Sequence, residues 1–325
     1  LLNRSCFIAE PDQKYSARRQ SPGAYGSASV HHTSLEDQAR TLQATGAYRV
    51  LRRIAPLPLN TQESRDQTRV GIFLDLETTG LDPIRDEIIE FGMVPFVYTL
   101  DGRILGTLPA FSRLREPSQP IPPEITALTG ITQEMVAGKA ITPEEIARFV
   151  AQAALIVAHN ARFDRPFAER FWEGFSTRPW ACSMEDVPWQ AEGFDGRSLG
   201  YLVMQAGWFF NGHRAADDCL AGVTLLSTCL PKTQTPALSA LLQEARQPRW
   251  QIWAENAPFD LKDKLKARGY RWNDGTDGRP KAWFIEVPQV QKEEELHFLK
   301  TEIYLHEVSP LTREVTAWDR FSIRA

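Results

Sequence analysis

The sequence predicts an α/β protein in which helices flank a mixed β-sheet, followed by a smaller α+β domain. A nearly continuous apolar run over 70–76 has the composition of a buried strand. Two further apolar segments, 88–98 and 104–108, flank the hairpin dipeptide Asp101-Gly102. Further along the chain, helical patterns alternate with short apolar strands. This order is typical of a mixed sheet with helices packed against it.

Each remaining element has its own local signal. Ser34 followed by Asp37 predicts the start of a helix that Gly46 ends, and a short strand is expected over 48–51. The run Thr-Pro-Glu-Glu at 142–145 combines an N-cap with a proline at the first helical position and a glutamate at the third, which predicts a helix over 142–153. The other expected elements are a strand over 155–158 and helices over 164–172, 198–205 and 216–230.

Changes in composition divide the chain. The first segment is rich in Ser, Gly, Gln and Arg and lacks periodicity, which predicts disorder. Prolines and polar residues around a short helical piece mark a linker before a tryptophan-rich C-terminal region. The expected parts are a disordered segment over 1–33, a short helix, strand and linker over 34–69, the main α/β domain over 70–232, a linker over 233–248 and a small α+β accessory domain over 249–325.

The 325-residue chain has an ordinary globular composition, with 42% hydrophobic and 24% charged residues. It contains neither an apolar run of about 18 residues, the length of a membrane span, nor a basic-then-apolar signal peptide. Its four cysteines form no C-x-x-C pair and show no zinc spacing. We therefore expect a cytoplasmic protein without a membrane partner. The net charge of −4 neither favours nor excludes a nucleic-acid substrate, because bound cations can offset an acidic surface.

Three short acidic segments contain the candidate catalytic residues, and the first follows the strand at 70–76. Asp75 and Glu77 are two residues apart on that strand, so their side chains point to the same face. Two carboxylates that close together repel each other and normally need a cation between them. Taken alone, the pair is explained equally well by solvated charges at a strand end.

The other two segments each begin with a histidine. The segment 159–164 (His-Asn-Ala-Arg-Phe-Asp) follows the strand at 155–158, and Asp164 alone is better explained as a helix N-cap. The segment 213–218 (His-Arg-Ala-Ala-Asp-Asp) lies at a helix start, where a histidine and an acid five residues later can border one cleft. Together the three segments supply a set of oxygen donors that Mg²⁺ prefers and Mn²⁺ accepts, namely Asp75, Glu77, Asp164 and Asp218.

These segments resemble the DEDDh exonuclease superfamily, which includes the epsilon (proofreading) subunit of bacterial DNA polymerase III. The resemblance covers about residues 70–230 and implies a ribonuclease-H-like mixed β-sheet flanked by helices. The matching motifs, in chain order, are Asp75-x-Glu77 with Thr78-Thr79-Gly80, His159-Asn160-x-x-Phe163-Asp164 and His213-x-Ala215-x-x-Asp218.

The resemblance implies a 3′→5′ exonuclease that releases nucleoside 5′-monophosphates, with DNA as the first expectation. The four carboxylates would hold two Mg²⁺ or Mn²⁺ ions, and His213 would take the proton of the attacking water. Asp217 lacks the family spacing from His213, so it is expected to cap the helix or face solvent. The implied partners are a single-stranded or frayed 3′ end of DNA, or of RNA, and replication or repair proteins.

The same resemblance places further side chains beside the terminal nucleotide. These residues are Thr78, Thr79, Gly80, Leu81, His159, Asn160 and Phe163. For Leu81 and Phe163, packing in the core is an equally good explanation. Many relatives have His-Gly-Ile where this chain has Thr-Gly-Ile at 129–131, so a histidine contact is absent there.

The segment 259–272 combines basic residues with Tyr270 and Trp272. It predicts a short helix that ends at Gly269, followed by a strand-turn-strand around 274–278. The segment either grips a nucleic-acid strand or is a solvated helix with its tryptophans in a small core. The second alternative is favoured because several aspartates dilute the positive charge.

Two other functions remain open on the sequence. An RNA 3′ exonuclease of the oligoribonuclease type would use the same five catalytic residues. A non-catalytic module that binds nucleic-acid ends or a replisome partner is disfavoured, because such a module has no need of four acids and a histidine.

Overall fold

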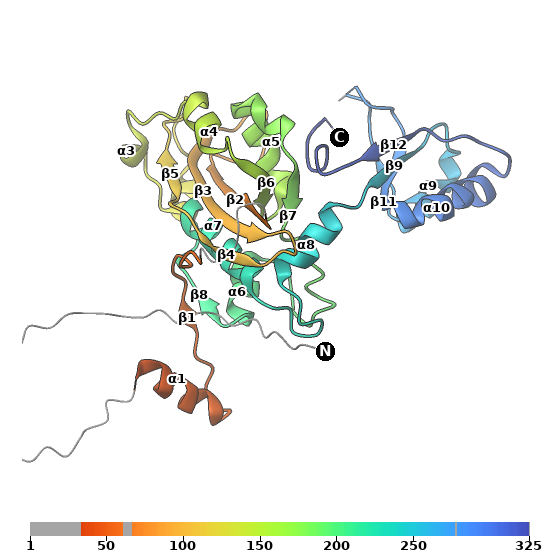
Figure 1. The fold of residues 1–325 in the computed structure, drawn as a ribbon. Helices are drawn as coiled ribbons and strands as arrows, with labels where there is room; N and C mark the ends of the chain where they lie inside the picture. Colours follow the sequence, from red (N-terminus) through yellow and green to blue (C-terminus); the bar gives the residue numbers. More distant parts are fainter. Residues whose placement is uncertain (1–33, 61–66, 277, 325) are drawn as a thin grey trace, which may run out of the picture.

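The computed structural model describes residues 34–60, 67–276 and 278–324 and is built around two large sheets (Figure 1). The first sheet has the strand order β4-β3-β2-β6-β7, and β5 also pairs with β3. Its strands are β2 (Thr68–Thr78), β3 (Ile88–Thr99), β4 (Ile104–Thr107), β5 (Phe111–Leu114), β6 (Ala153–Ala158) and β7 (Trp180–Cys182). Strand β3 runs antiparallel to its neighbours, whereas β6 runs parallel to β2 and β7. The predicted mixed sheet is therefore confirmed.

Helices flank both faces of this sheet. They include α2 (Pro123–Thr129), α3 (Gln133–Val136), α4 (Pro143–Phe149), α5 (Ala161–Phe171), the 3₁₀ turn η2 (Glu173–Thr177), α6 (Leu199–Gln205), α7 (Ala215–Ser227) and α8 (Ala237–Ala245). Successive residues of β2 point to opposite faces. Phe73 packs in the cluster that contains α6, α7 and α8, whereas Ile72 and Leu74 pack in the cluster that contains α4 and α5.

Several predicted element boundaries need correction. The helix expected over 142–153 ends at Phe149, because Ala153 already pairs with Val70 at the start of β6. The strand expected over 48–51 is wrong. The pairing falls instead on β1 (Arg52–Arg53), whose partner β8 (Trp208–Phe209) has only two residues. The predicted N-terminal helix is present as α1 (Leu35–Ala44), with a capping box between Ser34 and Asp37. The disorder predicted for 1–33 lies outside the described residues.

The second sheet lies in the C-terminal part and is antiparallel throughout, with the order β10-β11-β9-β12. Its core includes Leu265, Tyr270 and Leu299. The predicted short helix and strand-turn-strand are both present. The elements are β9 (Arg249–Ala254), η3 (Phe259–Leu261), α9 (Lys262–Ala267), β10 (Arg271–Trp272), β11 (Trp283–Pro288), η4 (Gln289–Gln291), α10 (Lys292–Phe298), the π-helical η5 (Leu299–Tyr304) and β12 (Thr312–Val315).

The C-terminal part contacts the elements around the first sheet at several places. The short helical piece inside the predicted linker is α8, which buries Leu238 and Leu241 in the same cluster as α7. The last residues of the chain then return to α5, where the fully buried Arg165 donates to the carbonyls of Trp318 and Arg320 at 2.6 Å each. The division of the chain into domains stays a prediction. Among the described helices, none is long and apolar enough to cross a membrane.

Candidate active site

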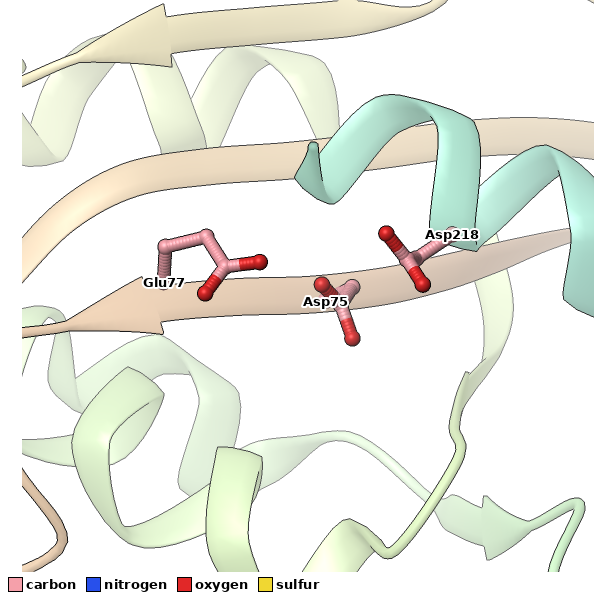
Figure 2. A group of neighbouring side chains, drawn as sticks. All are labelled: Asp75, Glu77 and Asp218. Carbon is pink, nitrogen blue, oxygen red and sulfur yellow. The ribbon is translucent and has the colours of Figure 1, made fainter. Parts of the chain in front are cut away.

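Three of the predicted carboxylates converge where β2 and α7 meet (Figure 2). Asp75 and Glu77 project from the same face of β2, and Asp218 comes from the first turn of α7. Their ligand oxygen atoms lie within 4.8 Å of one another. Helix α7 can approach the sheet closely because Gly92 of β3 lacks a side chain; a Cβ there would lie 2.4 Å from the backbone carbon of Ala215. The local fold therefore forms a compact acidic cluster.

Asp164, the fourth predicted carboxylate, lies beside this cluster but is not a member of the 4.8 Å group. It is in the first turn of α5 and is only 2% exposed. It does not cap the helix, because the N-cap position is Asn160. Its Oδ1 atom is buried and has no hydrogen-bond partner among the residues that the structure describes. A buried carboxylate oxygen without a partner is costly, so this atom fits a site for a cation or an ordered water.

The electrostatics of the cluster are unfavourable for four negative charges. Burial, together with the nearby charge of Asp164, raises the pKa of Asp75 well above its usual range. Burial also raises the pKa of Asp164 well above its usual range. Burial raises the pKa of Glu77 to about 7 and that of Asp218 to about 6. Such carboxylates need protons or cations near neutral pH. The donor set, all carboxylate oxygens, fits a hard divalent cation.

A fifth acid, Glu90, was missed by the sequence analysis. It lies on β3 directly opposite Glu77 and is completely buried. Its carboxylate accepts hydrogen bonds from Arg214 Nη2 at 3.0 Å, Arg214 Nε at 3.2 Å and the backbone N–H of Ala215 at 3.2 Å. Glu90 thus anchors the first residues of α7. An isolated glutamate within the apolar run 88–98 was the only sequence signal.

His213 directly precedes this anchored segment. Its backbone has a φ of 66°, a left-handed conformation that costs energy in residues other than glycine and is often found at functional sites. Its side chain is exposed to solvent. The neighbouring N–H of Arg214 donates to Asp218 Oδ2 at 3.1 Å, which ties the histidine loop to the acidic cluster. Asp217 faces solvent, as expected.

The residues predicted to contact a nucleotide after β2 differ in exposure. Leu81 is 83% exposed and does not pack in the core. Gly80 lies tightly against Asp86, since a Cβ at this position would be 2.4 Å from Asp86 Oδ2. The Thr78 hydroxyl donates to the carbonyl of Gly80 at 2.6 Å, and the Thr79 hydroxyl accepts from the N–H of Glu87 at 2.9 Å. These two hydroxyls shape the turn, and Leu81 is the side chain available to a ligand.

The residues predicted on the other side of the nucleotide are more strongly engaged by the protein. His159 contacts Ser183 Oγ at 2.9 Å and the carbonyl of Arg197 at 2.7 Å, so both ring nitrogens have partners. Burial lowers the pKa of His159 to about 4. Asn160 is exposed, with a φ of 75°. Phe163 packs against Phe167, with ring centroids 5.2 Å apart. The assignment of these residues to nucleotide binding stays a prediction.

Comparison with known proteins shows the family to which the chain belongs. The family model described as "Exonuclease" matches residues 72–226. The DNA polymerase III subunit epsilon of Treponema pallidum is 31% identical over 191 residues, which cover 52% of this chain and 86% of that protein. The chain belongs to this exonuclease family. The matched region of the exonuclease includes every candidate catalytic residue.

Other similar proteins are larger or more distant. The DNA polymerase III PolC-type proteins of Thermotoga petrophila and Thermotoga maritima are 33% and 32% identical, and the exonuclease spans only 11% of the length of each. The solved structure of exonuclease X in complex with 5′ overhanging duplex DNA is 26% identical, covers 52% of this chain and 98% of that chain, and has a TM-score of 0.39.

Proposed function

We propose that this exonuclease is a metal-dependent 3′→5′ enzyme that releases nucleoside 5′-monophosphates from the ends of DNA strands. The convergence of Asp75, Glu77 and Asp218 within 4.8 Å is the main observation in support. Four buried or half-buried carboxylates with raised pKa values would destabilise the fold unless they bound cations. The similarity to polymerase III epsilon and PolC-type proteins favours DNA over RNA as the substrate.

Each side chain has a separate role in this proposal. Asp75, Glu77 and Asp218 would hold one divalent cation, and Asp164 would contribute the unpartnered Oδ1 to a second. Bound Mg²⁺ or Mn²⁺ supplies charge neutralisation on the scissile phosphate and lowers the pKa of a coordinated water. The exposed imidazole of His213 accepts the proton of the attacking water as a general base.

The chain also prepares the site before substrate binds. Glu90 fixes the start of α7 through Arg214 and Ala215. This contact sets Asp218 and the histidine loop relative to β2, and such positioning contributes to catalysis because small displacements of reacting groups are costly. Leu81, exposed at the end of the turn after β2, would lie against the terminal base.

Degradation of 5′-labelled single-stranded DNA, with matched RNA alongside, tests the proposal. We expect Mg²⁺-dependent, stepwise shortening from the 3′ end that chelator abolishes. Asp75→Ala should be inactive, whereas Asp217→Ala, which removes an adjacent but exposed acid, should keep most of the activity. Faster degradation of RNA would change the proposed substrate. Intact DNA and RNA with both Mg²⁺ and Mn²⁺ would refute a catalytic function.

A further inference from the structure

A second surface suited to nucleic acid lies on the β10–β11 hairpin, residues 271–283. Strand β10 is the outer strand of its sheet, so its two residues project to opposite faces at an open edge. Trp272 is 51% exposed, and its ring lies 5.6 Å from that of Trp283 in an edge-to-face arrangement. An exposed indole on an edge strand is unusual for a residue that only serves a core.

This surface is positively charged in an acidic protein. The hairpin has three basic and two acidic side chains, and residues 259–270 before it add four basic and two acidic ones, whereas the whole chain has a net charge of −4. Some of the basic groups are neutralised locally, since Lys264 pairs with Glu302 and Arg268 pairs with two glutamates. Within the part of the chain that the structure describes, Arg271 and Lys281 have no acidic partner within 4.0 Å. These two cations are therefore available to an anion.

The surroundings of Arg271 also favour an anionic ligand. Its guanidinium lies 4.9 Å from the centroid of the Phe284 ring. Burial, and then the like charge of Arg162, lower the pKa of Arg271. Glu286 and Glu185, whose charges act on Arg271, already have partners, because Glu286 accepts from Arg249 at 2.9 Å and Glu185 accepts from Arg162 at 3.1 Å. A bound phosphate would relieve the repulsion among these arginines.

The position of Arg162 relates this surface to the candidate active site. Arg162 is in the first turn of α5, two residues before Asp164. Residues two apart on a helix point in nearly opposite directions, so Arg162 points away from the face of α5 that carries Asp164, and its charge acts on Arg271 of the hairpin. A ligand on the hairpin would therefore lie outside the catalytic residues.

We propose that the β10–β11 hairpin binds a single nucleic-acid strand 5′ of the end that occupies the candidate active site. The strand crosses the open edge at β10, where Trp272 on one face stacks on a base and Arg271 on the other face, together with Lys281, contacts backbone phosphates. This inference rests on the proposed function for the identity of the ligand. An acidic protein segment would satisfy the cations, but it would offer no base to stack on Trp272.

Fluorescence anisotropy with a labelled 20-nucleotide DNA strand tests this inference across a range of salt concentrations. The measurements are made in chelator, so that the protein cannot degrade the probe. We expect Arg271→Ala/Lys281→Ala to reduce the salt slope of binding by about 1.4, or about 0.7 for each lost phosphate contact. Trp272→Ala should weaken binding about fivefold or more. The matched control Lys139→Ala/Arg148→Ala removes two exposed positive charges elsewhere and should change neither value.

Hydrolysis of the p-nitrophenyl ester of thymidine 5′-monophosphate separates this inference from the proposed function. The ester is too short to reach the hairpin, so the hairpin variants should hydrolyse it as the parent does. Unchanged DNA binding by the hairpin variants, or an equal loss in the control, would overturn the inference while leaving the exonuclease proposal intact. No binding of DNA by the parent would also overturn it. An inactive parent whose DNA binding depends on the hairpin would overturn only the proposed function.

Discussion

The contact between Glu90 and Arg214 leads to a prediction for both stability and catalysis. Glu90 is completely buried, and its carboxylate accepts four hydrogen bonds, from Ser112 Oγ, Arg214 Nε, Arg214 Nη2 and the N–H of Ala215. Arg214 is its only cationic partner among the described residues within 4.0 Å, and 44% of the arginine side chain is exposed. Arg214→Gln therefore leaves a buried negative charge uncompensated.

The structure sets the size of the expected effect. Removing one partner of a fully buried ion pair costs about 3–5 kcal/mol, but water already screens the half-exposed Arg214, so we expect about 2–3 kcal/mol for Arg214→Gln. Glu90→Gln keeps an acceptor for Ala215 and should cost about 1–2 kcal/mol. The double variant removes the stranded charge. The decrease in the free energy of unfolding of the double variant should be smaller than the sum of the decreases in the two single variants, by about 1 kcal/mol or more.

Activity should respond differently from stability. The pair fixes the start of α7, which is adjacent to His213 and contains Asp218. A displacement of about 1 Å in reacting groups can cost about 10²-fold in rate. We therefore expect kcat on single-stranded DNA to fall by about that factor in Arg214→Gln, with KM nearly unchanged. The double variant should regain stability but remain slow.

Urea denaturation and steady-state kinetics provide the measurements. Arg148→Gln is the matched control, because Arg148 is exposed and, among the described residues, its side chain donates a hydrogen bond only to the carbonyl of Glu144, at 3.3 Å. This control should change stability by no more than about 0.5 kcal/mol. If Arg214→Gln unfolds as the parent does and keeps its kcat, the anchoring of α7 by Glu90 is wrong. If only its stability falls, the pair supports the fold and has no role in positioning His213.

Four further predictions concern the metal site, the C-terminal tail, pH and Leu81. Asp75→Asn should raise the melting temperature in chelator, because it removes one charge from the repelling cluster. It should also abolish the stabilisation by Mg²⁺, which for the parent reaches about 2.7 kcal/mol when the Mg²⁺ concentration is 100 times the dissociation constant. Thermal shift assays with and without Mg²⁺ measure both effects. Asp186→Asn leaves the buried Arg320 without its carboxylate partner and should lower the free energy of unfolding, measured by urea denaturation, by about 3–5 kcal/mol. Asp186→Leu/Arg320→Met removes both charges and should recover most of that free energy. His159 has a pKa of about 4 in the folded protein and 6.5 in the unfolded chain, so the unfolded chain binds the proton first as the pH falls. The free energy of unfolding should therefore decline by up to about 3 kcal/mol between pH 6.5 and pH 4. His159→Gln should lack this part of the decline. Leu81→Ala should change the free energy of unfolding by no more than about 0.5 kcal/mol, because the side chain is 83% exposed. It should raise the KM for DNA, and an unchanged KM would exclude a contact between Leu81 and the terminal base.

Much of the sheet could be predicted because its strands are encoded locally. The apolar run before Asp75 and the Asp101-Gly102 turn predict β2, β3 and β4 without knowledge of their partners. The start of α5 could not be predicted in this way. Its N-cap is Asn160 in a left-handed conformation with no side-chain capping bond, so the capping pattern placed the helix start at Asp164, three residues too late. Asparagine adopts this conformation more readily than most residues, but without a side-chain capping bond it does not give the usual N-cap pattern.

For the candidate site too, the sequence indicates the residue types but not their surroundings in the fold. The motif spacing predicted Asp75, Glu77 and Asp218, which the structure brings within 4.8 Å of one another. The catalytic roles of these residues, of Asp164 and of His213 stay predictions. Spacing contains no information on burial, however, and burial is the first cause of the raised pKa of Asp75 and of Asp164. Glu90 illustrates this point most clearly. Its partner Arg214 is 124 residues away in the chain. The strand register places Glu90 opposite Glu77, and the hydrogen bonds to Arg214 and Ala215 show that this acid anchors α7. The acids of the cluster and the acid that is neutralised by an arginine are indistinguishable by type, and the fold alone separates them.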